Sequence, residues 1–329
     1  NTLADRNVAI GNEALEAFNI TTSTDSYNVA VGFQAGHAIT TGIRNTLIGG
    51  LAGDALTDAD KNVAIGYLAL SGDTLGSTSV AVGMGTLQNQ NFTTATNSFN
   101  TALGHEAGND ITFGTVNTLI GGLAGDALTE GNNNVAVGYA ALGSDTKGDR
   151  NISIGSGSLA TQNFTTSTDA YNVAIGHDAG NQITTGGFNN LIGGLAGDAL
   201  TSGNSNVAIG YASLSTDTLG DRNVAIGHIA LNAQNFTTST DSYNVGVGYQ
   251  AGASLTTGFR NTLIGSLVGD SLTDADNNVA LGYSALGSDT LGSGAVAIGA
   301  GALNTQNFTT ATTNYNVGVG LDAGKSITT

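Results

Sequence analysis

The sequence predicts an all-β fold, a parallel β-roll or β-solenoid of about 18 coils, and three observations support this. A five-residue phrase, Asn-Val-Ala-Ile-Gly or a close variant, occurs 18 times at regular spacing. The phrase alternates β-branched and small residues with a period of two, as a strand does. The 17-residue repeat is too short for a helical hairpin, which needs more than about 30 residues. It suits one coil made of short strands and turns.

The spacing of the phrase defines a larger unit. The copies begin at residues 7, 28, 45, 62, 79, 100, 117, 134, 151, 172, 189, 206, 223, 244, 261, 278, 295 and 316. The steps run 21, 17, 17, 17 and then begin again, so the 17-residue coil, with every fourth coil of 21, is nested in a longer super-repeat. We therefore expect a single repetitive domain over 1–329, with super-repeats at 7–78, 79–150, 151–222, 223–294 and, in part, 295–329. Both ends fall inside a repeat, which indicates a fragment of a longer chain.

The first and last positions of the phrase have separate roles. Gly closes all 18 copies, which indicates a backbone position with positive φ or the close approach of another chain. Asn opens 16 of the 18 copies, with Ser79 and Ala295 in the other two. Stacked Asn side chains can hydrogen-bond along the coil axis, so we expect an Asn ladder at one corner of the coil.

The second half of each coil is less regular. In the coil that begins at Asn62 it contains Ala69–Leu70 and then a polar turn. We predict a second short strand near Ala69–Leu70. Leu75, in the turn, is expected to reach the core as a third apolar contact.

The middle residue of the phrase points away from its Val and Ile neighbours and is never charged in 18 copies. A solvent-facing position sampled this often would include charged residues, so both faces of the strand are predicted to be buried. One face would line the coil, and the other would meet a partner chain across a symmetry axis. With Val and Ile inside, the inter-chain stripe contains Ala9, Ala30, Leu47, Ala64, Ala81, Ala102, Leu119, Ala136, Leu191 and Leu263. Two alternatives stay open: Ala lines the interior while Val and Ile meet the partner, or the Ala stripe is simply exposed.

The longer coils carry a polar loop with an aromatic residue near each end. These candidate surface-contact residues are Phe92, Phe99, Phe164, Tyr171, Phe236, Tyr243, Phe308 and Tyr315. The pair can fasten the loop to the coil, form an exposed platform for a sugar, or contact another protomer. Each loop also contains Asn-x-Thr, as at Asn91, which matches a glycosylation acceptor.

Composition excludes several classes of function. Eight Lys and Arg against 25 Asp and Glu give a net charge of −17, which argues against nucleic acid and against an anionic membrane as partners of this segment. Cys is absent, and so are the common hydrolase, phosphate-binding and dinucleotide-binding motifs. Because a catalytic constellation is singular and this chain repeats its features four or five times, we expect no enzyme, no resident metal and no cofactor.

Recurrent acidic residues in the turns are the one candidate for weak Ca²⁺ binding. They form two sets with one member per super-repeat, Asp54, Asp126, Asp198 and Asp270 in the first and Asp73, Asp145, Asp217 and Asp289 in the second. Capping of turns by Asp is the simpler interpretation.

The unit Asn206–Leu214, followed by the turn Asp217–Gly220, resembles the repeats of phage and phage-like tail fibres. The repeated Asn/Ser-Val-Ala-Ile-Gly phrase also resembles the head domains of trimeric autotransporter adhesins. The resemblance implies a left-handed β-roll assembled as a homotrimer and located outside the cell, on a virion tail fibre or a cell surface. The expected function is a structural shaft that presents an element binding a host or surface receptor, such as a glycan. The alternatives are a bacterial cell-surface adhesin that binds along its rod and a monomeric glycan- or ice-binding solenoid.

Overall fold

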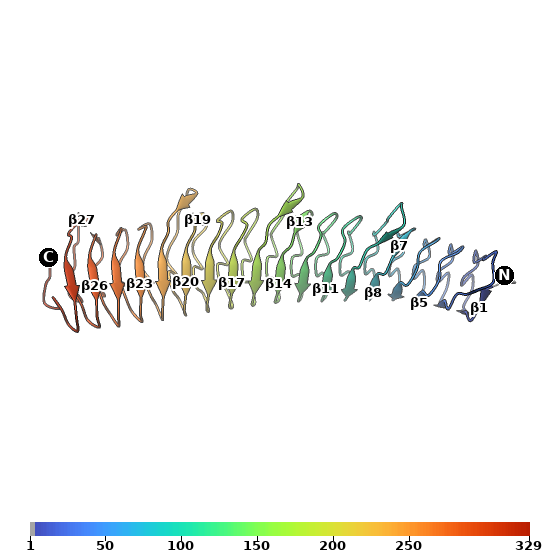
Figure 1. Ribbon diagram of the computed structural model, residues 1–329, viewed down its shortest axis with the longest axis horizontal. Helices are drawn as coiled ribbons and strands as arrows, with labels where there is room; N and C mark the ends of the chain where they lie inside the picture. Colours follow the sequence, from blue (N-terminus) through green and yellow to red (C-terminus); the bar gives the residue numbers. More distant parts are fainter. Residues whose placement is uncertain (1–3) are drawn as a thin grey trace. The chain divides into compact units, whose positions relative to one another are not determined.

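The computed structural model describes residues 4–329 and confirms an all-β, parallel β-solenoid of about 18 coils without helices in the described residues. The chain divides into two compact units, Asn1–Ala170 and Tyr171–Thr329. Each unit is a run of coils that contributes one three-residue strand per coil, and these strands lie side by side (Figure 1).

The long strands begin one residue after the Asn of each phrase. In the first unit they are β2 (Val8–Ile10), β4 (Val29–Val31), β5 (Thr46–Ile48), β6 (Val63–Ile65), β8 (Val80–Val82), β10 (Thr101–Leu103), β11 (Thr118–Ile120), β12 (Val135–Val137) and β14 (Ile152–Ile154). In the second they are β16 (Val173–Ile175), β17 (Asn190–Ile192), β18 (Val207–Ile209), β20 (Val224–Ile226), β22 (Val245–Val247), β23 (Thr262–Ile264), β24 (Val279–Leu281), β26 (Val296–Ile298) and β28 (Val317–Val319). Consecutive strands pair in parallel with equivalent residues opposite each other, as Ala64 and Ala81 are in β6 and β8.

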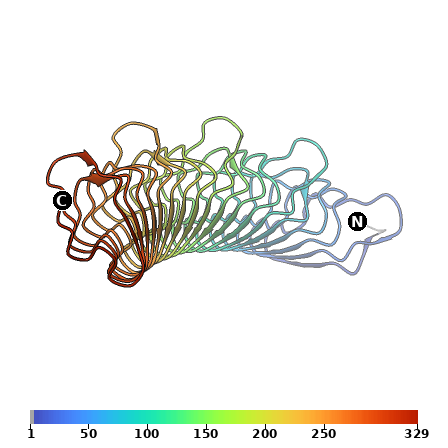
Figure 2. The same cartoon turned by 60° about the vertical axis from the view of Figure 1, so that its left-hand side comes forward.

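Shorter strands of two residues mark the longer coils. They are β1 (Ala4–Asp5), β3 (Thr24–Asp25), β7 (Gly76–Ser77), β9 (Thr96–Asn97), β13 (Gly148–Asp149), β15 (Thr168–Asp169), β19 (Gly220–Asp221), β21 (Thr240–Asp241), β25 (Gly292–Ser293) and β27 (Thr312–Thr313). Each pairs a coil corner with the long loop of the next coil, as β19 does with β21. In each unit the long loops project beyond the neighbouring turns (Figure 2).

The predicted second strand near Ala69–Leu70 is wrong. Both residues lie in a turn in which Leu68 and Leu70 adopt the left-handed region, with φ of 58° and 54°. Ala69 and Leu70 are nevertheless buried in the core, whereas Leu75 is only half-buried. The core contact from the turn is therefore made by Leu70, and its burial comes from turn geometry instead of strand alternation.

The Gly at the end of the phrase meets two requirements at once. At Gly66, φ is 139°, and an added Cβ would lie 2.3 Å from the carbonyl oxygen of Gly83. A side chain would therefore be strained by the backbone and would also overlap the next coil. The positive φ is confirmed, but the close neighbour is the next coil of the same chain and not another chain.

The Asn ladder is confirmed. The backbone N–H of Asn45 donates to Oδ1 of Asn28 at 2.9 Å, and that of Asn62 donates to Oδ1 of Asn45 at 2.9 Å. The Asn45 side-chain amide also donates to the carbonyl oxygen of Ala59 at 2.7 Å, which ties the corner to the segment that leads into the next coil. These Asn side chains are fully buried, so the ladder satisfies polar groups that would otherwise be costly inside the coil.

The predicted inter-chain stripe is also wrong, because its residues lie inside the coil. Fully buried in the single chain are Ala30, Leu47, Ala64, Ala81, Ala102, Leu119, Ala136, Leu191 and Leu263. Ala9 pairs with Ala30 in the same register but is exposed in the first described coil. A side chain enclosed by its own coil cannot reach a partner. The first half of the open alternative is confirmed: Ala lines the interior, and the Val and Ile residues point outward.

The core alternates large and small residues between strand and turn. In one coil the strand places Leu119 in the core. The turn of the same coil then has Gly125, and the turn of the preceding coil has Gly108. Cδ atoms of Leu119 lie 2.8 Å and 2.6 Å from the places where a Cβ on Gly125 and Gly108 would stand. In the next coil the strand places Ala136 in the core and the turn places Leu142 there. The pair Ala136 and Leu142 therefore has a side-chain volume similar to that of the pair Leu119 and Gly125.

Candidate functional site

The outward face of the long strands is apolar along each unit. It consists of the first and third residues of every strand, and none of them is charged. Thr46, Thr101, Thr118, Asn190 and Thr262 are the polar exceptions. The Ile residues on this face are half-buried to exposed, for example Ile209 half-buried, Ile192 37% exposed and Ile264 40% exposed. Within the described part of the chain no other segment covers this face.

Aromatic residues extend the apolar face past the Gly that ends each strand. In the second unit Tyr211, His228 and Tyr249 follow this Gly in three successive coils. Their rings stack with centroids 5.5 Å and 5.6 Å apart. Stacking holds the rings in place along one edge of the strand face.

The opposite edge is formed by the residue that precedes the Asn of each phrase. In the non-glycine cases this residue has a left-handed backbone, as at Arg6 and Arg222 with φ of 65° and 61°. Six of the eight Lys and Arg residues of the chain occupy this position: Arg6, Arg44, Lys61, Arg150, Arg222 and Arg260. The second aromatic of each long loop stands in the same column. We call this the corner column; aligning the residue before each Asn across the 18 copies would have revealed it from sequence.

The two aromatic residues of each long loop have different environments. Phe92, Phe164 and Phe236 are 6–8% exposed, whereas Phe99, Tyr171, Tyr243 and Tyr315 are exposed, and Phe308 is half-buried. The first aromatic therefore packs the loop onto the coil. The second lies on the corner column, where Arg222 stands over the Tyr243 ring at 5.7 Å and donates to its hydroxyl at 3.1 Å.

The Asp residues before each long loop lie inside the coil. Oδ1 of Asp217 accepts hydrogen bonds from the backbone N–H of Gly220 at 3.0 Å and of Phe236 at 3.1 Å. Its Oδ2 accepts from the Gln234 amide at 2.6 Å. Burial nevertheless raises the pKa of Asp217, and that of Asp145, because no cation compensates the charge among these partners. This carboxylate closes the turn and fixes the start of the loop.

The other Asp set lies nearer to solvent. Burial raises the pKa of the half-buried Asp54, Asp126, Asp198 and Asp270. Among the described residues, one group has ligand atoms close enough to hold a metal ion, Glu13, Glu16 and His37, whose donor atoms lie within 4.8 Å of one another. His37 Nε2 and Glu16 Oε2 are 2.9 Å apart.

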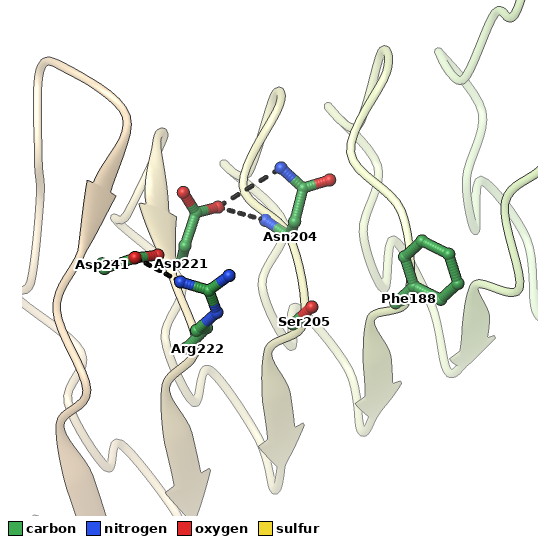
Figure 3. A pocket seen from close by; sticks show the side chains of 6 residues that line it. All are labelled: Phe188, Asn204, Ser205, Asp221, Arg222 and Asp241. Atoms are coloured by element: carbon green, nitrogen blue, oxygen red, sulfur yellow. Dashed lines mark hydrogen bonds and ion pairs between the residues drawn. The ribbon is translucent and has the colours of Figure 1, made fainter.

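A hollow of about 320 Å³ lies beside the corner column of the second unit, lined by Phe188, Asn204, Ser205, Asp221, Arg222 and Asp241 (Figure 3). Arg222 forms an ion pair with Asp241, which belongs to the long loop. Asp221 is held rigidly: its Oδ1 accepts from the backbone N–H of Asn204 at 2.6 Å, and its Oδ2 accepts from the Ser239 hydroxyl at 2.9 Å. The ring of Phe188 stands on the other side of the hollow and is 56% exposed.

None of the residues that line this hollow was predicted from the sequence as a site residue. They come from four successive coils, so no local motif joins them. A second hollow, of about 500 Å³, lies one super-repeat later and includes Asp276, Asn277, Gly294 and Tyr315. It has neither an aromatic ring nor an Arg at the positions of Phe188 and Arg222 among its lining residues.

Comparison with protein-family models, with curated proteins and with solved structures finds no match to this chain. In residues 4–329 there is no helix of the length and apolar character needed to cross a bilayer.

Proposed function

We propose that this chain is the non-enzymatic structural shaft of an extracellular homotrimeric fibre of the phage-like tail-fibre type. Three copies meet through the outward Val and Ile face, and the shaft presents an element that binds a host or another surface. The absence of charge from this face is the observation that carries the proposal.

The distribution of charge supports burial of this face. The chain carries 33 charged residues, 8 basic and 25 acidic, and none stands at an outward position of a long strand. A continuous uncharged strip of Val, Ile and Leu exposed to water would be an aggregation hazard. Each Ile buried there contributes roughly 25 cal/mol per Å² of apolar surface removed from water. Repeated over the strands of each unit, this stabilises an assembly in which each coil adds a small increment.

A second candidate is a cell-surface adhesin that binds a ligand along its rod. The observation that favours it is the hollow beside the long loop, because a pure spacer has no need of a shaped cavity with an exposed ring. The two functions share the same trimeric assembly and differ in whether the shaft itself contacts a ligand.

The mass in solution tests the assembly. Light scattering at two concentrations should give about three times 32.6 kDa for the unaltered chain. Ile120→Lys combined with Ile264→Lys places a charge on the outward face of each unit and should give a monomeric species with unchanged circular dichroism. The matched control, Thr94→Lys with Thr238→Lys in the exposed loops, should stay trimeric. A monomeric unaltered chain would refute the proposal.

A further inference from the structure

The hollow beside the long loop of the second unit is a slot between the side chains of Phe188 and Arg222. Phe188, Ser205 and Arg222 are the corner residues of three successive coils. Coils stack about 4.8 Å apart, so Phe188 and Arg222 stand roughly 10 Å apart along the column. That separation, measured along the column, leaves space for one saturated six-membered ring between the two side chains. Ser205 leaves this space open because its side chain is small (Figure 3).

The two walls of the slot are fixed in orientation. The Phe188 ring stacks on Tyr171 of the preceding coil, with centroids 5.8 Å apart and planes 23° apart. The ring lies beside Tyr171, and in Figure 3 it turns one edge toward Ser205 and one open face away from the row of coils. On the far side, Arg222 is held by its ion pair with Asp241 and by its hydrogen bond to Tyr243.

The polar groups of the slot suit hydroxyls. The interactions of the Arg222 guanidinium among the described residues use one of its two terminal amino groups, so the rest of its five N–H donors can serve a ligand. Asp241 supplies acceptor oxygens, and the exposed Ser205 hydroxyl has no partner among the described residues. An aromatic face for the C–H groups of a ring, with donors and acceptors beside it, is the chemistry that recognises a pyranose.

Charge decides which pyranose fits. Asp221, Asp241 and Arg222 give the hollow a net charge of −1, and the chain carries −17. An anionic sugar, or a nucleotide with its phosphates, would be repelled.

The combination of Phe188, Ser205 and Arg222 at three successive corners occurs once in the sequence, although most other features of the chain recur in every super-repeat. The corners equivalent to Phe188 in the other super-repeats are Arg44, Val116 and Arg260, so no other provides the aromatic wall. The corner equivalent to Arg222 is Gly294 in the next super-repeat. A feature needed only for stacking of coils would recur in every super-repeat.

We propose that the slot between Phe188 and Arg222 binds one residue of a neutral glycan, with the sugar ring stacked on Phe188 and its hydroxyls bonded to Arg222, Asp241 and Ser205. This inference gives the shaft a ligand-binding site of its own and does not depend on the trimer.

Titration calorimetry and ligand-observed NMR on the full chain test it. The probes are the methyl glycosides of glucose, galactose and N-acetylglucosamine, with glucuronic acid as the anionic counterpart. We expect saturable binding of at least one neutral glycoside and none of glucuronic acid. Phe188→Asn should weaken that binding at least tenfold, and Arg222→Gly should weaken it as well.

Both variants introduce a residue type that the corner column already contains. Asn occurs at Asn133 and Asn277, which have the same left-handed backbone, and Gly occurs at Gly294, which is equivalent to Arg222. The two variants should therefore fold, which circular dichroism verifies. Val116→Asn, at the corner equivalent to Phe188 one super-repeat earlier, is the matched control and should leave binding unchanged. The proposal is overturned if no neutral glycoside binds, if glucuronic acid binds better, or if Phe188→Asn binds as the unaltered chain does. The mass measured on the same samples reports on the trimer separately.

Discussion

At the scale of single residues, the solenoid depends on left-handed backbone conformations at residues that do not favour them. The corner before each Asn is one such place, and Arg, Tyr, Phe and Val occupy it with φ near 60°. A non-glycine residue in this region costs about 1–2 kcal/mol. Stacked coils compensate this cost through ladder hydrogen bonds such as those of Asn45.

Val116 and Thr78 should be the most strained corners, because a β-branched side chain is the poorest fit to φ near 60°. Val116→Asn should raise the free energy of unfolding by about 1 kcal/mol, since Asn tolerates this region. The reverse change at the next corner, Asn133→Val, should lower it by a similar amount. Chemical denaturation of both variants measures this, and destabilisation by Val116→Asn would contradict the strain.

The residue types allowed some of this to be predicted. Gly at the strand end and Asn at the corner have specific backbone or hydrogen-bonding reasons to recur, and both were interpreted correctly. The left-handed conformation of Leu68, Leu70 and Val116 could not be inferred, because Leu and Val have no preference for it. Closure of the coil imposes it.

At the scale of the coil, packing depends on the exchange of volume between strand and turn. Leu119 fills the space left by two glycines, whereas the next coil places its large residue, Leu142, in the turn. Leu142 is left-handed with φ of 55°, and Gly125 has φ of 56°, so the two turns share one backbone.

Leu119→Ala should lower the free energy of unfolding by about 2–5 kcal/mol, because the side chain is fully buried and leaves a cavity. Adding Gly125→Leu should recover part of this loss by recreating the arrangement of Ala136 and Leu142. Gly125→Leu alone should be destabilising, because the added side chain would overlap Leu119. Denaturation of the two single variants and the double variant measures the coupling, and simple additivity would show that the two positions do not exchange volume.

The spacing of the repeated phrase predicted the coil period, and strand alternation predicted the long strands. Alternation could not decide which face of the strand was inside. Val63 and Ile65 are larger and more apolar than Ala64, which favoured them for the core. In this coil the bulk of the core comes instead from the turn residue Leu70, which leaves room for only a small residue, Ala64, in the strand. The slot was missed for a related reason: Phe188 and Arg222 are separated by two full coils of sequence and come together only through coil stacking.

At the scale of the whole molecule, the excess of acidic residues and the buried carboxylates both make the folded chain less stable at neutral pH than at mildly acidic pH. Net charge of −17 causes self-repulsion at neutral pH. Burial raises the folded-state pKa of Asp145 and Asp217 above the unfolded value of about 3.9. The folded chain therefore binds protons at higher pH than the unfolded chain does.

The unfolding temperature should accordingly rise as pH falls from 7.5 toward 4.5, opposite to the usual acid sensitivity. Protonation of Asp145 and Asp217 adds to the free energy of unfolding. This added stability is fully present below about pH 3.9 and is lost as pH rises through their raised folded-state pKa values. Calorimetry at pH 7.5, 6 and 4.5 measures it, and a higher unfolding temperature is expected at each step of acidification. In 1 M NaCl the repulsion between surface charges is screened. The pH dependence of the unfolding temperature that persists in this salt therefore belongs to the buried carboxyl groups. A fall in unfolding temperature on acidification would contradict this account.

The core residues repeat every four coils, and this repeat also determines how such a chain can change its length. Asp73 needs Gln90 one coil later, and Leu47 needs Gly53 in its own turn. Loss of the one coil that carries Gln90 would leave the buried carboxylate of Asp73 without its amide, and loss of the one coil that carries Gly36 would bring Leu47 against Leu15. Loss or gain of one complete super-repeat would preserve every one of these pairings. Recombination between gene copies in whole super-repeats is therefore the route by which the shaft could be lengthened or shortened without a new core.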